Sequence, residues 1–168
     1  MCLGVFALIH EVAINPRRVA FVNVHIRPYK QQVMVPTTFK VDTGADCTTI
    51  SSEQLLKLGY DEDWIKSGRL LVGDERPTVV SGLPLDGCYR VILPEIQIGE
   101  WVGYNWPVLT NSRFRTLLGT DSMQFFNWTF DYEHNVCRFS LIPNKRKILF
   151  RGQEQSIHEV EREVERIG

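Results

Sequence analysis

Two aspartates in the stretch FKVDTGADCTTIS have a setting that suits a reactive site. Asp42 ends an apolar run typical of a strand, Thr43 and Gly44 follow it directly, and Asp46 comes two residues later. A strand end would hold the first carboxylate rigidly, the glycine lets backbone approach closely, and the threonine hydroxyl can fix the turn by a hydrogen bond. A carboxylate held in this way can transfer a proton to or from a reacting group.

A pair of such carboxylates can do more than one alone. Two carboxyl groups close together share one proton, so one acts as a base toward water and the other as an acid toward a carbonyl oxygen. The sequence contains a single Asp-Thr/Ser-Gly, since Glu95, Asp121 and Asp131 are not followed by Thr/Ser-Gly. A site of this kind would need two copies of the chain, each giving one Asp42 across a twofold axis.

The elements expected around the motif are mainly strands. Period-two alternation predicts a strand over 20–26, and an apolar run predicts a second over 33–41, the two forming a hairpin that leads into Asp42. β-Branched residues at 48–50 predict a short strand, and the Ser51-Ser52-Glu53-Gln54 sequence is typical of a capping box that opens a short helix, with Gly59 as its stop.

The second half of the chain continues in the same way. We expect a further helical turn over 61–67 and a long hairpin over 78–91, with Ser81-Gly82-Leu83-Pro84 near its tip. Thr120 or Asp121 is expected to cap a short helix that ends by Phe126. Strands are predicted over 128–131, 136–141 and 148–150, and a polar helix over 155–166, beyond a basic cluster at 145–147.

Three segments in this order, VDTGADCTTIS, VVSGLPLDGCYRV, and LLGTDSM followed by FNWTFDY, resemble the retropepsin-like aspartic proteases. That family includes the retroviral proteases and cellular relatives of the same half-size fold. The resemblance covers about residues 19–141. It implies an all-β acid-protease half-lobe, a closed β-barrel with short helices that is active as a twofold dimer. We accordingly divide the chain into a protease domain over 1–142 and a basic and helical C-terminal tail over 143–168.

The resemblance also implies a role for each matching residue. Asp42 would be the catalytic aspartate, and Thr43 and Gly44 would form the active-site loop, with the Thr43 hydroxyl locking the loops of the two subunits together. The substrate would be a peptide or protein, held as an extended strand with hydrophobic residues beside the cleaved bond, and no metal or other cofactor is expected. The implied substrate-binding residues are Ala45, Asp46, Val80, Ser81 and Gly82, the last three near the tip of a flap, and the implied buried support is Leu117, Leu118 and Gly119.

Two departures from the retroviral pattern bear on this resemblance. Retroviral enzymes commonly carry Arg after the apolar-apolar-Gly triplet, where it pairs with the last Asp of DTGAD, whereas this sequence has Thr120 there. Asp46 must therefore be satisfied in another way. The tail after Pro143 extends beyond the resemblance, so we also expect a dimer built differently from a viral one.

Several alternatives stay open at this point. Asp42 can be a solvated turn residue, Asp46 a structural cap of the loop, and Ser81-Gly82 a plain hairpin turn. Cys47 is interpreted as a small core residue rather than a nucleophile, because no histidine accompanies it locally. For the whole chain, the alternative is a retropepsin-like peptide-binding or dimerisation module whose catalysis is weak, absent or regulated by the tail.

The composition of the chain bears on its possible binding partners and its cellular location. The 168 residues are 43% hydrophobic and 23% charged with a net charge of −1, which gives no support for nucleic acid or an anionic membrane as a partner. The four histidines lack metal-ligand spacing, and the four cysteines form no C-x-x-C pair. Scattered thiols and a start without a basic signal-peptide region indicate a cytoplasmic protein, with a secretory signal as the minor alternative.

Overall fold

Six strands close into a barrel in the structure, a computed structural model that describes residues 8–78, 81–145 and 147–149. The ring closes because β6 pairs with β7 along almost its whole length and also pairs with β2. Strand β5 extends the sheet beside β6, and β11 extends it beside β7. In ring order the barrel strands are β2 (Phe21–Ile26), β3 (Val35–Val41), β8 (Leu117–Leu118), β4 (Thr49–Ser51), β7 (Trp101–Asn111) and β6 (Tyr89–Ile98), and the flanking strands are β5 (Arg69–Leu70) and β11 (Lys147–Leu149).

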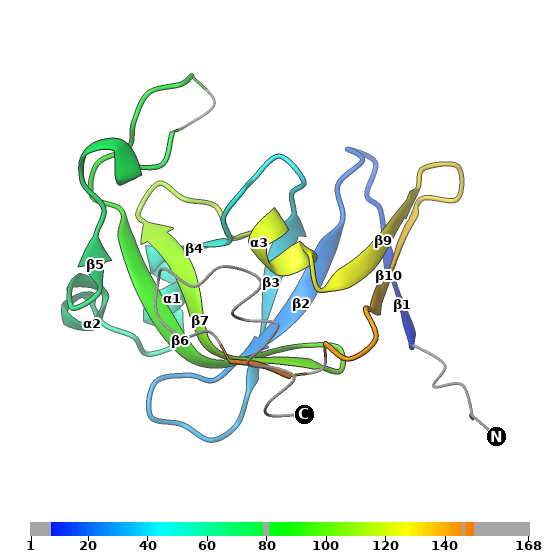
Figure 1. Cartoon of the computed structure of the whole chain (residues 1–168), viewed down its shortest axis with the longest axis horizontal. Helices are drawn as coiled ribbons and strands as arrows, with labels where there is room; N and C mark the ends of the chain where they lie inside the picture. The colour runs from blue at the N-terminus through cyan, green and yellow to red at the C-terminus, as the bar shows by residue number, and fades with distance from the viewer. Residues whose placement is uncertain (1–7, 79–80, 146, 150–168) are drawn as a thin grey trace.

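A three-stranded antiparallel sheet stands beside the barrel (Figure 1). Short helices fill the connections, and no helix in the described ranges is long and apolar enough to cross a membrane. The sheet has the order β1 (Ile9–Ala13), β10 (Val136–Leu141) and β9 (Phe126–Asp131), and the helices are α1 (Ser52–Lys57), α2 (Glu62–Lys66), α3 (Thr120–Met123) and the 3-10 turn η1 (Gly73–Glu75).

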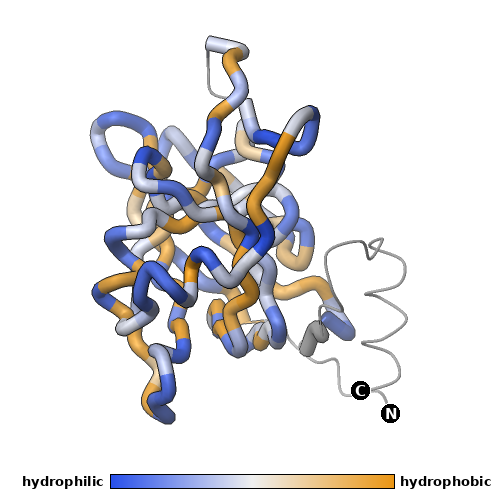
Figure 2. The backbone as a smooth tube through the Cα atoms, turned by 90° about the vertical axis from the view of Figure 1, so that its left-hand side faces the viewer, coloured by the Kyte–Doolittle hydropathy of each residue, from blue (hydrophilic) through white to orange (hydrophobic). Residues whose placement is uncertain are grey.

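Alternation of burial explains why these segments form strands. In β2 every second side chain is buried and the others are exposed, which is the pattern of a sheet with one face on the core. In Figure 2 hydrophobic (orange) and hydrophilic (blue) stretches are interspersed along the tube. Trp101 and Trp106 on β7 lie at 0% and 1% exposure, so both side chains belong to the core. The mostly-β barrel with short helices is therefore the fold that the sequence analysis expected.

Local predictions near the motif are confirmed. Strands β2 and β3 pair antiparallel and lead into Asp42. The Ser51 hydroxyl accepts a hydrogen bond from the backbone N–H of Gln54 at 3.1 Å, which caps α1. Gly59 follows the end of α1 with φ at +87°, a conformation that glycine adopts without strain. Asp61 caps the predicted second helical turn through the N–H of Trp64.

The predicted hairpin over 78–91 is wrong in its bounds. Thr78 pairs with Pro84 in an isolated bridge around the turn at Ser81-Gly82, but the partners of Tyr89 and Arg90 are Leu70 and Arg69. The hairpin therefore runs from 69 to 90 and its ladder is interrupted. Pro77 and Pro84 cannot donate a backbone hydrogen bond, and Gly82 and Gly87 turn the chain at φ of +80° and +70°. We call residues 71–88 the flap segment.

Two further predictions are corrected or only partly covered. The cap of α3 is Gly119, with no side-chain hydrogen bond, so neither Thr120 nor Asp121 caps this helix. A last strand exists, shifted by one residue, because Lys147–Leu149 pairs in parallel with β7. The division at residue 142 stays a prediction. Val80 and the predicted helix over 155–166 lie outside the described residues.

Candidate active site

Asp42 lies directly after β3, where a strand from the far end of the sequence supports it. Its backbone N–H donates to the carbonyl of Leu118 at 3.0 Å, which continues the parallel pairing of Val41 with Leu118. On the other side, the N–H of Val41 donates to the carbonyl of Ala20 at 2.9 Å. The position of the half-buried Asp42 is thus fixed by backbone bonds to two neighbouring segments.

The loop that follows, residues 42–48, folds back on the Asp42 carboxylate. We call it the aspartate loop. The N–H of Gly44 donates to Oδ1 of Asp42 at 2.9 Å, and the N–H of Ala45 donates to the Asp42 carbonyl at 3.2 Å. A side chain at residue 44 would place its Cβ 3.3 Å from Asp42 Oδ1, so the glycine keeps this carboxylate uncrowded. Thr43, Gly44 and Asp46 are exposed, so the outer surface of the loop is accessible to solvent.

Gly119 supports the aspartate loop from below through very close backbone contact. A Cβ at this position would lie 2.5 Å from the carbonyl carbon of Cys47 and 2.9 Å from the carbonyl oxygen of Ala45. The next residues bind the loop, since the N–H of Thr120 donates to the Ala45 carbonyl at 2.8 Å. The backbone N–H of Asp121 donates to the Asp46 carbonyl at 3.3 Å, while the Asp46 side chain faces solvent. With Thr120 in place of arginine, this backbone pairing holds the end of the loop.

A buried chain of side-chain hydrogen bonds fixes the base of the loop. The indole N–H of Trp106 can only donate, so it donates to Ser122 Oγ (3.1 Å), and Ser122 donates in turn to Thr48 Oγ1 (2.8 Å). Thr48 donates to Asp121 Oδ1 at 2.6 Å, and the Thr48 oxygen also accepts the N–H of Gly119 at 3.1 Å. Every hydroxyl in this chain is satisfied, which stabilises one arrangement of the loop.

Asp121 is the half-buried acid at the end of this chain. Its two oxygens accept the backbone N–H of Thr48, each at 3.0 Å. Burial raises the pKa of its carboxyl, and the hydrogen bonds from Thr48 and Ser122 only partly oppose the shift. The sequence analysis assigned no site role to Asp121, Thr48 or Ser122. The position of Asp121, two residues after Leu118-Gly119, was the available signal.

Cys47, inside the aspartate loop, packs against a small apolar cluster at the base of the flap segment. The cluster contains Leu71, Cys88 and Leu109. Burial raises the pKa of the Cys47 thiol, and it raises that of Cys88 to about 11. A thiol with a raised pKa is a poor nucleophile, so the interpretation of Cys47 as a packing residue is favoured, although it is half-buried rather than buried.

The flap segment and the aspartate loop project from the same end of the barrel (Figure 1). Ser81 and Gly82 are exposed at the described part of the tip. No hydrogen bond within the described ranges joins them to Asp42, Ala45 or Asp46. The structure thus brings the motif together with its predicted support, Leu117, Leu118 and Gly119, and leaves the flap tip on a separate loop.

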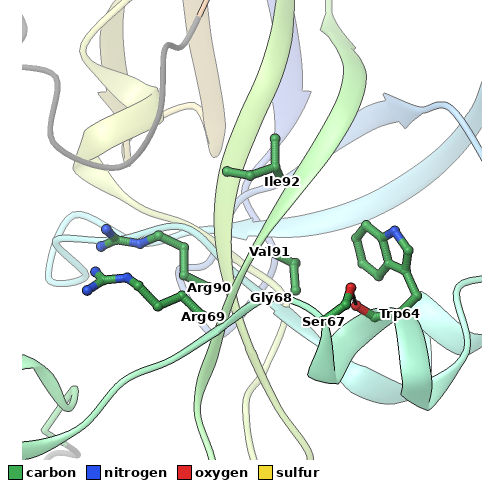
Figure 3. A pocket seen from close by; sticks show the side chains of 7 residues that line it. All are labelled: Trp64, Ser67, Gly68, Arg69, Arg90, Val91 and Ile92. Atoms are coloured by element: carbon green, nitrogen blue, oxygen red, sulfur yellow. Dashed lines mark hydrogen bonds between the residues drawn. The ribbon is translucent and has the colours of Figure 1, made fainter.

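A surface pocket of about 520 Å³ lies elsewhere, between α2 and β6. In Figure 3 the side chains of Arg69 and Arg90 extend in one direction, away from Trp64 on α2. None of its lining residues belongs to the aspartate loop or its support, so this pocket is not the candidate site. Among the described residues, no group of three or more His, Cys, Asp or Glu could hold a metal ion.

Comparison with known proteins bears on the fold. No protein-family model and no curated protein sequence matches the chain. Among solved structures, a retropepsin-like aspartic protease from Rickettsia conorii matches with a TM-score of 0.61 at 18% identity, over 80% of this chain and 92% of that one. The retroviral protease-like domain of Ddi1 from Leishmania major matches over 73% of this chain and 93% of that one at 14% identity, but its TM-score of 0.39 is too low to carry weight. Together with the barrel and the supported DTGAD loop, the first match shows that this chain has the retropepsin-like fold.

Proposed function

We propose that the chain is an aspartic endopeptidase that hydrolyses peptide bonds as a homodimer. The observation that carries the proposal is the aspartate loop itself, in which a carboxylate follows a barrel strand, accepts the N–H of Gly44 and is supported by Leu118 and Gly119. A turn that served only to reverse the chain would need neither the acid nor the buried support.

In the proposed reaction, two Asp42 carboxyl groups share one proton across the twofold axis. The ionised group takes a proton from water as that water attacks the scissile carbonyl carbon, and the protonated group donates its proton to the carbonyl oxygen. The tetrahedral intermediate then collapses: its C–N bond breaks, the amine nitrogen takes the proton held by the first carboxyl group, and one hydroxyl of the intermediate returns its proton to the second carboxylate. No covalent bond to the protein forms at any step.

The substrate we propose is an extended peptide with hydrophobic residues beside the cleaved bond. Three apolar side chains in the flap segment or directly before it support this choice, since Leu70, Val72 and Leu83 are 44%, 60% and 65% exposed. An extended peptide lying under the flap segment would cover them and would bind as an added strand. A cytoplasmic location remains a proposal, and the free thiols of Cys47, Cys88 and Cys137 are compatible with it.

The test is cleavage of a denatured, proteome-derived peptide mixture between about pH 4 and pH 7, comparing the wild type with Asp42→Asn. We expect cleavage by the wild type, none by the variant, and a rate per chain that falls on dilution as the dimer dissociates. If the variant cleaves as well as the wild type, Asp42 is not the catalyst. A folded, dimeric wild type that cleaves nothing would favour a peptide-binding or dimerisation module instead.

A further inference from the structure

Asn111, the last residue of β7, uses its side-chain amide to hold the flap segment. The residue is 7% exposed. Its Nδ2 group donates to the backbone carbonyls of Asp86 and Gly87 at 2.9 and 2.8 Å, so both amide hydrogens are used on the flap segment. Neither carbonyl is a strand-ladder acceptor of β6, which begins at Tyr89.

The part of the flap segment that Asn111 holds is the descending arm, residues 84–88. Gly87 turns the chain there at φ +70°, and the buried Cys88 at the end of the arm packs against Leu109 of β7. The Arg76 guanidinium pairs with the exposed Asp86 carboxylate at 2.8 Å, and the N–H of Leu85 donates to the Pro77 carbonyl at 2.9 Å. Both of these bonds join the arm to the rest of the flap segment, whereas the two Asn111 bonds and the packing of Cys88 join it to the barrel.

The other side of the same amide holds the loop that leads to the candidate active site. Oδ1 of Asn111 accepts the N–H of Arg113 at 2.8 Å, and its backbone carbonyl accepts the N–H of Phe114 at 3.2 Å. This loop is tied to β4, since the Arg115 carbonyl accepts the Thr49 hydroxyl at 2.6 Å. Three residues later comes Leu118, whose carbonyl accepts the N–H of Asp42.

We propose that Asn111 is a positioning residue that sets the flap arm relative to the strand supporting Asp42, by donating to the arm and accepting from the 111–116 loop. This inference rests on the proposed function for its kinetic consequence. The structural consequence, that the arm loses two hydrogen bonds to the barrel when the two donors are lost, does not depend on the proposed function.

The informative variant is Asn111→Asp, which is nearly isosteric with the wild type. A carboxylate can still accept the Arg113 N–H, but it cannot donate to the Asp86 and Gly87 carbonyls. Asn23→Asp on β2 is the matched control, because that amide oxygen only accepts a hydrogen bond from the Thr38 hydroxyl. Two measurements follow on both variants and the wild type: amide hydrogen exchange across residues 84–88, and the kinetics of peptide cleavage.

We expect Asn111→Asp to raise the exchange rate of the arm about tenfold or more, the effect of losing two hydrogen bonds, while the rest of the barrel exchanges as before. We expect KM to rise about tenfold and kcat to change by less than about threefold, since the arm would contact bound substrate rather than the reacting atoms. At about pH 4 the carboxyl group introduced by this substitution, once protonated, can again donate one hydrogen bond. The ratio of variant to wild-type exchange should therefore fall there relative to about pH 7.

The outcomes separate the two proposals. If the wild type is active and Asn111→Asp changes neither the amide hydrogen exchange of residues 84–88 nor KM, the positioning role of Asn111 is overturned. The proposed protease function is then unaffected. If amide hydrogen exchange in residues 84–88 is faster in Asn111→Asp but the wild type cleaves nothing, the positioning role of Asn111 is supported and the proposed function is overturned. Equal effects in Asn23→Asp would show a general response to added charge, which overturns the inference as well.

Discussion

Replacing Gly119 with alanine tests whether the aspartate loop depends on direct backbone contact from below. The new Cβ would lie 2.5 Å from the Cys47 carbonyl carbon and 2.6 Å from its oxygen, where ordinary contact begins at 3.4 Å. The loop must therefore move by about 0.9 Å to relieve the contact. Because backbone atoms and not a flexible side chain are in the way, we expect a cost near the upper end for overpacking, about 3 kcal/mol.

The variant is tested by two measurements, one of stability and one of activity. With a urea m-value of about 2 kcal/mol/M, this cost lowers the unfolding midpoint by about 1.5 M. A misplacement of about 1 Å at a reacting group lowers kcat/KM about a hundredfold, measured per folded chain. Gly68→Ala is the matched control, since its Cβ would meet the Arg90 carbonyl oxygen at 2.5 Å outside the aspartate loop and its support. It should lose stability and keep its kcat/KM. A Gly119→Ala protein whose midpoint and kcat/KM both equal those of the wild type would refute the contact as the reason for the glycine.

Three further results are expected from the same region. Thr48→Val should destabilise the protein by about 2–3 kcal/mol in chemical denaturation, because it removes a donor to the half-buried Asp121 carboxylate. Thr38→Val, on the exposed face of β3, should change the stability by less than about 0.5 kcal/mol. The raised pKa of Asp121 means that the folded protein binds the proton of this carboxyl group more tightly than the unfolded chain does. Asp121 therefore contributes most to stability below its pKa in the unfolded chain. This contribution falls as the pH rises through its pKa in the folded protein. Asp121→Asn should remove that slope from the urea midpoints measured between about pH 4 and pH 7. Cys88, with a pKa of about 11, should resist alkylation at about pH 8 in the folded protein and react once urea unfolds it.

Local chemistry made much of the fold predictable. The β2–β3 hairpin depends on alternation within each strand, and the cap at Ser51 depends on a residue three positions away. The Asp42-Thr43-Gly44 set needs no distant information to be noticed. These features are determined by neighbours in the sequence, so the sequence contains the signal for them.

The support of the site depends on distant pairs and could not be predicted in this way. Thr48 and Asp121 are 73 residues apart, and Asn111 meets the Asp86 carbonyl across a segment that contains a whole hairpin. An isolated Asn or Thr carries no pattern that says which backbone group it will bind. The flap bounds were wrong for a related reason, since the partner of Tyr89 is Leu70, on the far side of an irregular stretch.

The two-residue strand β8 has a consequence for the order in which the protein matures. Leu117 pairs with Lys40 on one side and with Thr49 on the other, so the barrel cannot be completed around Asp42 until this late segment arrives. During synthesis the aspartate loop (residues 42–48) emerges well before its support (residues 117–119), and such non-local pairing is slow to form. A nascent chain, or a fragment that stops before Leu117, would contain the whole DTGAD sequence but would lack the strand that supports it. On the proposed function, this delays any proteolytic activity until the segment with Leu117 and Leu118 has left the ribosome.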